Sequence, residues 1–143
     1  MQTKEIHLLT QNLGNQCINN GYKLVIAESC TGGLVCSTIT SVSGSSKWFE
    51  RGFVTYSNQS KCDLLGVAKK ILINHGAVSQ NVANEMAMGA LQNSHGNLSL
   101  SITGIAGPNG GTKDKPVGTV YFAICNQNSI LFERRSNFAG TRW

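Results

Sequence analysis

The sequence has 143 residues, of which 41% are hydrophobic and 13% charged, with 16 glycines and two prolines. A chain of this length and composition suits one globular α/β domain over residues 1–143 and excludes both a disordered segment and two ordinary domains. The formal net charge of +5 would suit an anionic partner, but the basic residues form no stripe with interleaved aromatic residues. We therefore expect no nucleic-acid partner.

The cysteines and the N-terminus indicate the cellular environment. Five cysteines form no C-x-x-C pair and have no histidines at the spacing of a zinc site, so we expect reduced thiols and no metal. The N-terminus lacks the apolar run of a secretion signal, and the longest apolar stretches are far too short to span a bilayer. The sequence therefore predicts a cytoplasmic protein with no membrane partner.

Helices and strands alternate along the first half of the chain. Apolar residues at helical spacing predict helices, and short runs rich in β-branched residues predict buried strands. The predicted elements are, in chain order, a helix over 3–20 that stops at Gly21, a strand over 22–27, a helix over 34–40, a strand over 49–56, and a helix over 59–65 that stops at Gly66.

The second half of the chain begins with residues 68–73, whose short pattern is ambiguous between helix and strand. A long helix capped by Ser79 follows, with a buried face at Val82, Met86, Ala90 and Leu91. The remaining predicted elements are a strand over 98–102, a glycine-rich loop over 103–111, and a hairpin with strands over 117–125 and 129–135.

This element order predicts a three-layer α/β/α fold with a mixed, mostly parallel sheet. In such a fold a helix normally follows the last strand and covers the sheet. The pattern predicts none after residue 135. We therefore expect a truncated chain that lacks its final C-terminal helix and leaves part of the sheet uncovered.

The segment with the clearest chemical content is Glu28-Ser29-Cys30-Thr31-Gly32-Gly33. A serine at the carboxyl end of a buried strand lies at the ligand-facing edge of an α/β sheet. Backbone N–H groups near Thr31 to Gly33 could bind a developing oxyanion, and the glycines would admit a ligand close to the backbone. Ser29 is therefore a candidate nucleophile, although a simple helix cap would also explain Ser29 or Thr31. The segment is not a G-x-S-x-G elbow.

A serine nucleophile needs a base, and the sequence offers two kinds. Three histidines have spacings that do not favour a serine–histidine pair: His7, His75 and His95. A partly desolvated lysine is the other established base. Lys61 follows a strand end, as Ser29 does, and Tyr56 would lie at the same edge. The alternative for Lys61 is an ordinary exposed lysine on a helix.

Two further features leave alternatives open. The loop from Thr103 to Thr112 has four glycines after a buried strand and could present N–H groups to a phosphate or ribose, or be a plain surface loop. It matches neither G-x-G-x-x-G nor a Walker loop, so neither dinucleotide nor nucleoside triphosphate binding follows. Cys30 is a rival nucleophile, although side-chain alternation along the strand would turn it to the opposite face from Ser29.

Several segments taken together resemble the CinA C-terminal domain family. They are E-S-C-T-G-G, G-S-S-K-W-F-E-R-G-F-V-T-Y-S-N-Q-S-K, H-G-A-V-S and S-I-T-G-I-A-G-P-N-G-G-T-K-D-K-P-V-G-T-V-Y-F-A. The resemblance runs from about residue 27 to the end and is greatest to the stand-alone nicotinamide-nucleotide amidases. It implies hydrolysis of the carboxamide of nicotinamide mononucleotide to nicotinate mononucleotide and ammonia, in pyridine-nucleotide salvage, with no metal or cofactor.

The resemblance also implies roles for individual residues. Ser29 would be the nucleophile, Lys61 the base and Tyr56 an assisting hydroxyl, and Arg142 lies in a G-T-R that is similar to the family's G-D-R. The expected substrate-binding residues are Thr31, Gly32, Gly33, Thr103, Gly104, Gly107 and Arg142. The expected partners are a small nucleotide substrate and a second copy of the chain in a homodimer. The alternatives are a nucleotide-binding or regulatory module that does not turn over, and an enzyme that acts through Cys30.

Overall fold

The structure is a computed structural model and describes residues 3–142. Its elements, in chain order, are α1 (Lys4–Asn20), β1 (Leu24–Glu28), α2 (Leu34–Thr40), a 3-10 turn η1 (Ser45–Lys47), β2 (Phe49–Val54), α3 (Asn58–Leu65), α4 (Lys69–His75), α5 (Gln80–Gln92), β3 (Leu98–Gly104), β4 (Thr119–Asn126) and β5 (Ile130–Asn137). Most predicted elements are present, with ends displaced by one or two residues.

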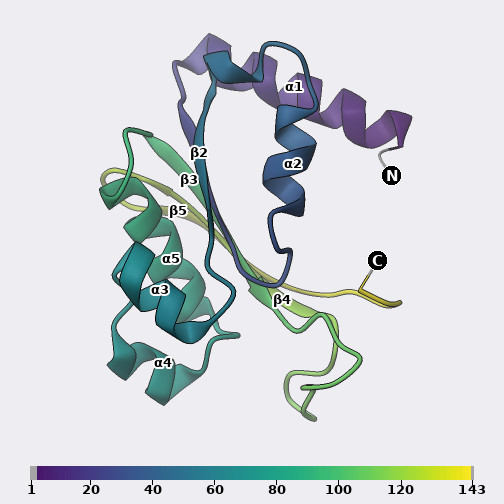
Figure 1. The fold of residues 1–143 in the computed structure, drawn as a ribbon, viewed down its shortest axis with the longest axis vertical. Coiled ribbons are helices and arrows are strands. Elements are labelled where there is room, and N and C mark those ends of the chain that lie inside the picture. Colours follow the sequence, from purple (N-terminus) through teal and green to yellow (C-terminus); the bar gives the residue numbers. More distant parts are fainter. Residues whose placement is uncertain (1–2, 143) are drawn as a thin grey trace.

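The strands form one mixed sheet in the order β2-β1-β3-β4-β5. β1 pairs in parallel with both β2 and β3, whereas β3 with β4 and β4 with β5 are antiparallel. Of the five described strands, β4 is therefore the one whose direction is opposite to that of the other four. Figure 1 shows α1 and α2 on one face of this sheet and α3, α4 and α5 on the other. The predicted α/β class with a mixed sheet is confirmed.

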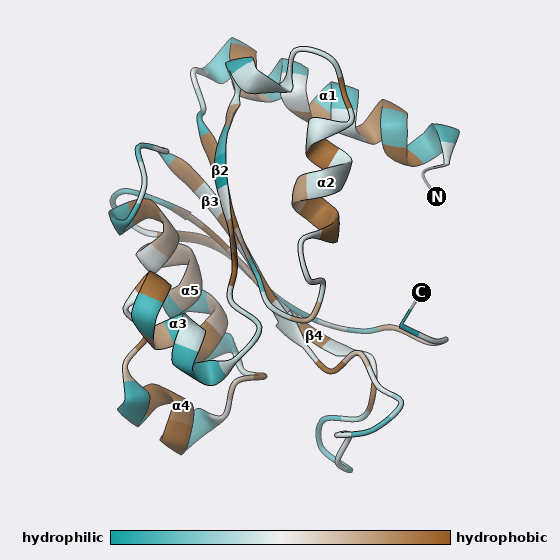
Figure 2. Ribbon diagram, in the orientation of Figure 1, coloured by the Kyte–Doolittle hydropathy of each residue, from teal (hydrophilic) through white to brown (hydrophobic). Residues whose placement is uncertain are grey.

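The core consists of apolar layers on both faces of β1. Val25 and Ala27 pack against α3 and α5, while Leu24 and Ile26 pack against residues of α1 and α2. β1 is buried on both faces because it lies inside the sheet and helices cover it from each side. Figure 2 shows that α3 carries both hydrophobic and hydrophilic residues, which is typical of a helix with one buried face.

The carboxyl ends of the three parallel strands meet at one edge of the sheet. Glu28, the last residue of β1, pairs with Val54 of β2 and with Ile102 of β3. The N–H of Thr55 donates to the carbonyl of Glu28 at 2.8 Å, so the segment after β2 stays against the end of β1. The segment after β1, the segment after β2 and the end of β3 therefore lie together at this edge. The sequence predicted this meeting of strand ends.

The position of α3 is fixed at both of its ends. Ser57 caps it by accepting the N–H of Ser60, and Gly66 ends it in the left-handed conformation, at φ 68°. At Gly89 α5 approaches this end so closely that an added Cβ would lie 1.9 Å from the carbonyl oxygen of Leu65. α3 is therefore held against α5 in one position.

One element differs from the sequence-based expectations. Residues 69–75, which the pattern left unassigned, form α4, whose Ile71 and Leu72 pack against the core below it. β5, at one edge of the sheet, is the last element within residues 3–142, and Phe132 and Phe138 are about half exposed. Over the same residues, none of the helices combines the length and the apolar character that a membrane crossing requires.

Candidate active site

Ser29 lies directly after β1, at the edge of the sheet where the parallel strands end. Its N–H donates to the carbonyl of Ile102 at 2.9 Å, which holds it against β3. Gly32 and Gly33 follow with φ values of 60° and 100°, so the chain turns through left-handed conformations that glycine adopts without strain before α2 begins. The turn leaves Ser29 mostly buried at the sheet edge, with its hydroxyl toward α3.

Lys61, on the first turns of α3, is the residue that contacts the Ser29 side chain. Its Nζ lies 3.0 Å from Ser29 Oγ, 3.0 Å from the carbonyl oxygen of Thr55 and 3.2 Å from that of Tyr56. Only 1% of the Lys61 surface is exposed. The structure thus brings together two side chains that are 32 positions apart in the sequence.

The environment of Lys61 favours its neutral form. Burial lowers the pKa of the amine, and the neighbouring thiols of Cys30 and Cys62 oppose this only in part. A neutral amine has two N–H donors and one lone pair, which match two carbonyl acceptors and one hydroxyl donor. The arrangement can therefore take the proton of the Ser29 hydroxyl and return it to a leaving group.

Tyr56 and Cys30 line the same small cleft as Ser29 and Lys61. The Tyr56 side chain is 61% exposed, and Lys61 contacts its carbonyl rather than its hydroxyl. Burial raises the pKa of the Cys30 thiol, so this side chain is a protonated thiol near neutral pH and a poor nucleophile. Since Lys61 hydrogen-bonds to Ser29 Oγ, the geometry favours Ser29 over Cys30.

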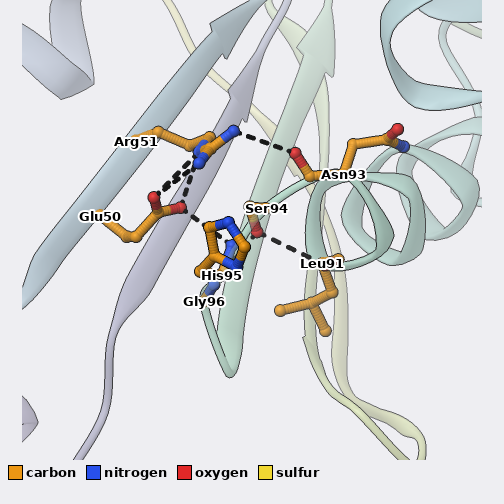
Figure 3. Close-up of polar contacts among 7 residues, drawn as sticks. All are labelled: Glu50, Arg51, Leu91, Asn93, Ser94, His95 and Gly96. Carbon is orange, nitrogen blue, oxygen red and sulfur yellow. Dashed lines mark hydrogen bonds and ion pairs between the residues drawn. The ribbon is translucent and has the colours of Figure 1, made fainter.

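The histidines lie away from this cleft. Figure 3 shows the backbone N–H of His95 against the carboxylate of Glu50, which pairs with Arg51 at 2.7 Å. These residues lie near the amino ends of β2 and β3, at the opposite end of the sheet from Ser29. His7 and His75 are exposed on α1 and α4, and the cleft around Ser29 includes neither. The described residues therefore offer no serine–histidine pair.

The remaining predicted site residues divide between two adjoining clefts. The small cleft, of about 210 Å³, contains Thr103, Gly104 and Arg142 together with the Ser29–Lys61 pair. A larger and mostly apolar cleft, of about 680 Å³, is lined by Thr31, Gly32 and Gly33 and shares Arg142 with the first. Gly107 lines neither cleft. In residues 3–142, no three His, Cys, Asp or Glu side chains gather in a way that could hold a metal ion.

Thr103 and Arg142 each have a structural contact. The buried Thr103 hydroxyl donates to the carbonyl of Ala77 at 2.9 Å and so fixes the wall of the small cleft. Arg142 Nε donates to the carbonyl of Gly107 at 2.7 Å. The terminal nitrogens of this guanidinium make no hydrogen bond within residues 3–142, so they can bind an anionic ligand where the two clefts meet.

Glu28 is an important residue that the sequence analysis did not single out. It is fully buried, and its carboxylate accepts the N–H groups of Gly33, Val35 and Cys36 at 2.9–3.2 Å. Burial alone would raise the pKa of Glu28, but hydrogen bonds from Cys36 and from the backbone outweigh it, and the pKa lies below its ordinary value. The available signal was a carboxylate just before a helix start, where the helix dipole stabilises negative charge.

Comparisons with known proteins identify the family. The sequence model of the CinA C-terminal domain matches residues 6–143. The chain is 47% identical over 142 residues to the nicotinamide-nucleotide amidohydrolase PncC of Escherichia coli (strain K12), covering 99% of this chain and 86% of that protein. A CinA-like protein of Citrifermentans bemidjiense is 52% identical over 123 residues, which are 86% of this chain and 30% of that protein.

Solved structures give the same assignment. The crystal structure of the competence/damage inducible protein CihA from Agrobacterium tumefaciens superposes with a TM-score of 0.92 at 40% identity, covering 97% of this chain and 84% of that one. A CinA superfamily protein from Escherichia coli superposes with a TM-score of 0.91 at 35% identity, over 99% and 83% of the two chains. Sequence and fold together show that this chain belongs to the CinA C-terminal domain family.

Proposed function

We propose that this chain hydrolyses the carboxamide of nicotinamide mononucleotide, giving nicotinate mononucleotide and ammonia. The observation that carries the proposal is the 3.0 Å contact between Ser29 Oγ and Lys61 Nζ in a buried position that opens on a cleft. The name of the 47% identical relative from Escherichia coli, a nicotinamide-nucleotide amidohydrolase, supports the choice of substrate.

The reaction would take place in two halves, with Lys61 moving one proton in each. Neutral Lys61 takes the proton of Ser29, whose oxygen attacks the carboxamide carbon to give a tetrahedral oxyanion. The protonated amine then gives the proton to the carboxamide nitrogen, and the C–N bond breaks with release of ammonia. Water cleaves the resulting ester after giving its proton to Lys61, and that proton returns to Ser29 as the nicotinate product leaves.

The clefts suggest how the substrate would lie. The small cleft around Ser29 would take the carboxamide end of the pyridine ring, with the exposed Tyr56 hydroxyl near the leaving nitrogen. Arg142 lies where the two clefts meet and would bind the phosphate through its free terminal nitrogens. The remaining details, which are a role in pyridine-nucleotide salvage, a cytoplasmic location and a homodimer, stay predictions.

Ammonia release from nicotinamide mononucleotide tests the proposed function directly. The purified chain is expected to convert the nucleotide to nicotinate mononucleotide with one ammonia for each turnover, and free nicotinamide is the matched control that lacks ribose and phosphate. Binding of the nucleotide without ammonia release would contradict the proposal and favour the alternative, a nucleotide-binding module of the same family.

Arg142→Gln is expected to raise KM for nicotinamide mononucleotide by about tenfold or more while changing kcat little, because a charge-assisted phosphate contact is lost. Nicotinamide riboside, which lacks the phosphate, should be hydrolysed equally well by both proteins. Arg134→Gln is the matched control, since Arg134 is exposed on β5 and bonds to Ser136. An equal loss with both substrates would show that Arg142 does not bind the phosphate.

A further inference from the structure

The backbone N–H groups in the turn after Ser29 differ in whether they have an oxygen acceptor. The N–H of Gly32 donates to the carbonyl of Ser29 at 3.1 Å, and the N–H of Gly33 donates to the Glu28 carboxylate at 3.2 Å. These two groups therefore have partners already. The N–H groups of Cys30 and Thr31 make no hydrogen bond to an oxygen atom within residues 3–142, and they lie against the Cys30 sulfur, a weak acceptor.

We propose that the N–H groups of Cys30 and Thr31 bind the oxyanion that forms when Ser29 attacks, and that Glu28 is the positioning residue that selects them. This inference rests on the proposed function and names the groups that stabilise its transition state. It revises the expectation that N–H groups near Thr31 to Gly33 would bind the oxyanion, because it keeps Thr31, adds Cys30 and removes the two glycines. Gly32 and Gly33 give the turn its shape, and they do not provide its donors.

The position of Cys30 suits this role. In the nucleophile elbow of α/β-hydrolases, a different turn that also follows a strand, the N–H of the residue after the nucleophile is one donor to the oxyanion. A hydrogen bond from an N–H group to a thiol sulfur is weak, so little energy is lost when an oxygen takes the place of the sulfur. The hydrogen bond that replaces it is strongest when that oxygen is negatively charged. Such a contact therefore strengthens in the transition state and raises kcat.

Glu28 would act through the shape of the turn. Its carboxylate holds the first turn of α2 by three N–H groups, so residues 30–33 have one arrangement. The Glu28 charge also opposes negative charge at the Cys30 sulfur, so the charge does not choose between these sites. Glu28 therefore selects the donors through the shape of the turn.

An amide-to-ester replacement at Cys30 tests the donor itself, because it removes the N–H and keeps the side chain. Cys17 and Cys36 lie on either side of the segment, so native chemical ligation can assemble the full chain from three pieces. The ester at Cys30 is expected to lower kcat by about 100-fold, the scale for losing one oxyanion donor, with KM within about threefold. The Tm should change little, because this N–H has no oxygen partner in the folded chain.

The same ester at Gly32 is the matched control. It removes a donor that closes the turn, so we expect a lower Tm and a much smaller loss of kcat than at Cys30. A Cys30 ester with the kcat of the unmodified chain would overturn the oxyanion assignment alone. An unmodified chain that releases no ammonia would overturn the proposed function, and the oxyanion assignment with it.

Glu28→Gln tests the positioning role with an ordinary variant. The amide cannot accept three N–H groups with both of its terminal atoms, so the turn loosens, and kcat is expected to fall at least about tenfold with KM within about threefold. Glu50→Gln is the control, since Glu50, drawn in Figure 3, lies near the amino end of β2 and Glu28 pairs with the carboxyl end of that strand. A lower Tm with unchanged kcat would show that Glu28 has a structural role only.

Discussion

Ser29→Ala is expected to lower ammonia release from nicotinamide mononucleotide by at least about 10⁴-fold, because the acyl-enzyme route needs the Ser29 oxygen. The folded structure should persist, since Lys61 keeps its hydrogen bonds to the carbonyls of Thr55 and Tyr56 and the backbone of residue 29 keeps its bond to Ile102. Single-turnover ammonia measurements with excess enzyme, together with the Tm of each protein, separate loss of chemistry from loss of fold.

Two further variants make this result specific. Thr38→Ala removes a hydroxyl that bonds to Leu34 on the exposed side of α2, so it controls for losing any hydroxyl in this region. Cys30→Ala is expected to stay active because its backbone N–H remains and its thiol is not the nucleophile. A dead Cys30→Ala beside an active Ser29→Ala would assign the chemistry to the cysteine.

The sequence predicted Ser29 and Lys61 because their positions follow from local patterns. Ser29 directly follows one strand and Lys61 lies on the helix after the next, both strands being short runs rich in β-branched residues, and the carboxyl ends of parallel strands meet at one edge. Their distance depends on α3, which its cap at Ser57 and its end at Gly66 define locally. The convergence of the two residues could therefore be expected before their distance was known.

Long-range hydrogen bonds were beyond the reach of these patterns. Whether Thr103 faces a ligand or the chain depends on the carbonyl of Ala77, which lies 26 positions away. The glycines of the loop after β3 suggested a phosphate cradle, but Gly107 lies outside both clefts and offers its carbonyl to Arg142. In the same way, a glutamate such as Glu28 is expected to be exposed, because this residue type is rarely buried. Only the structure shows that its strand end is buried.

Lys61→Ala is expected to lower kcat by at least about 100-fold, the loss typical of removing a general base. The change also leaves a buried space beside Ser29 Oγ, since the lysine side chain fills that position. A small primary amine such as ethylamine should enter this space and restore part of the turnover in proportion to its concentration. Lys61→Met, which fills the space without an amine, should show the same loss and no rescue.

The pH dependence of kcat/KM then identifies the active form of Lys61. Because burial lowers the pKa of this amine and the neutral form is the base, kcat/KM should rise with pH and level off above that lowered pKa. Between it and the ordinary lysine pKa the unfolded chain binds the extra proton, so stability also rises with pH across this interval. A rate that is highest at low pH would require a charged Lys61 and contradict its role as the base.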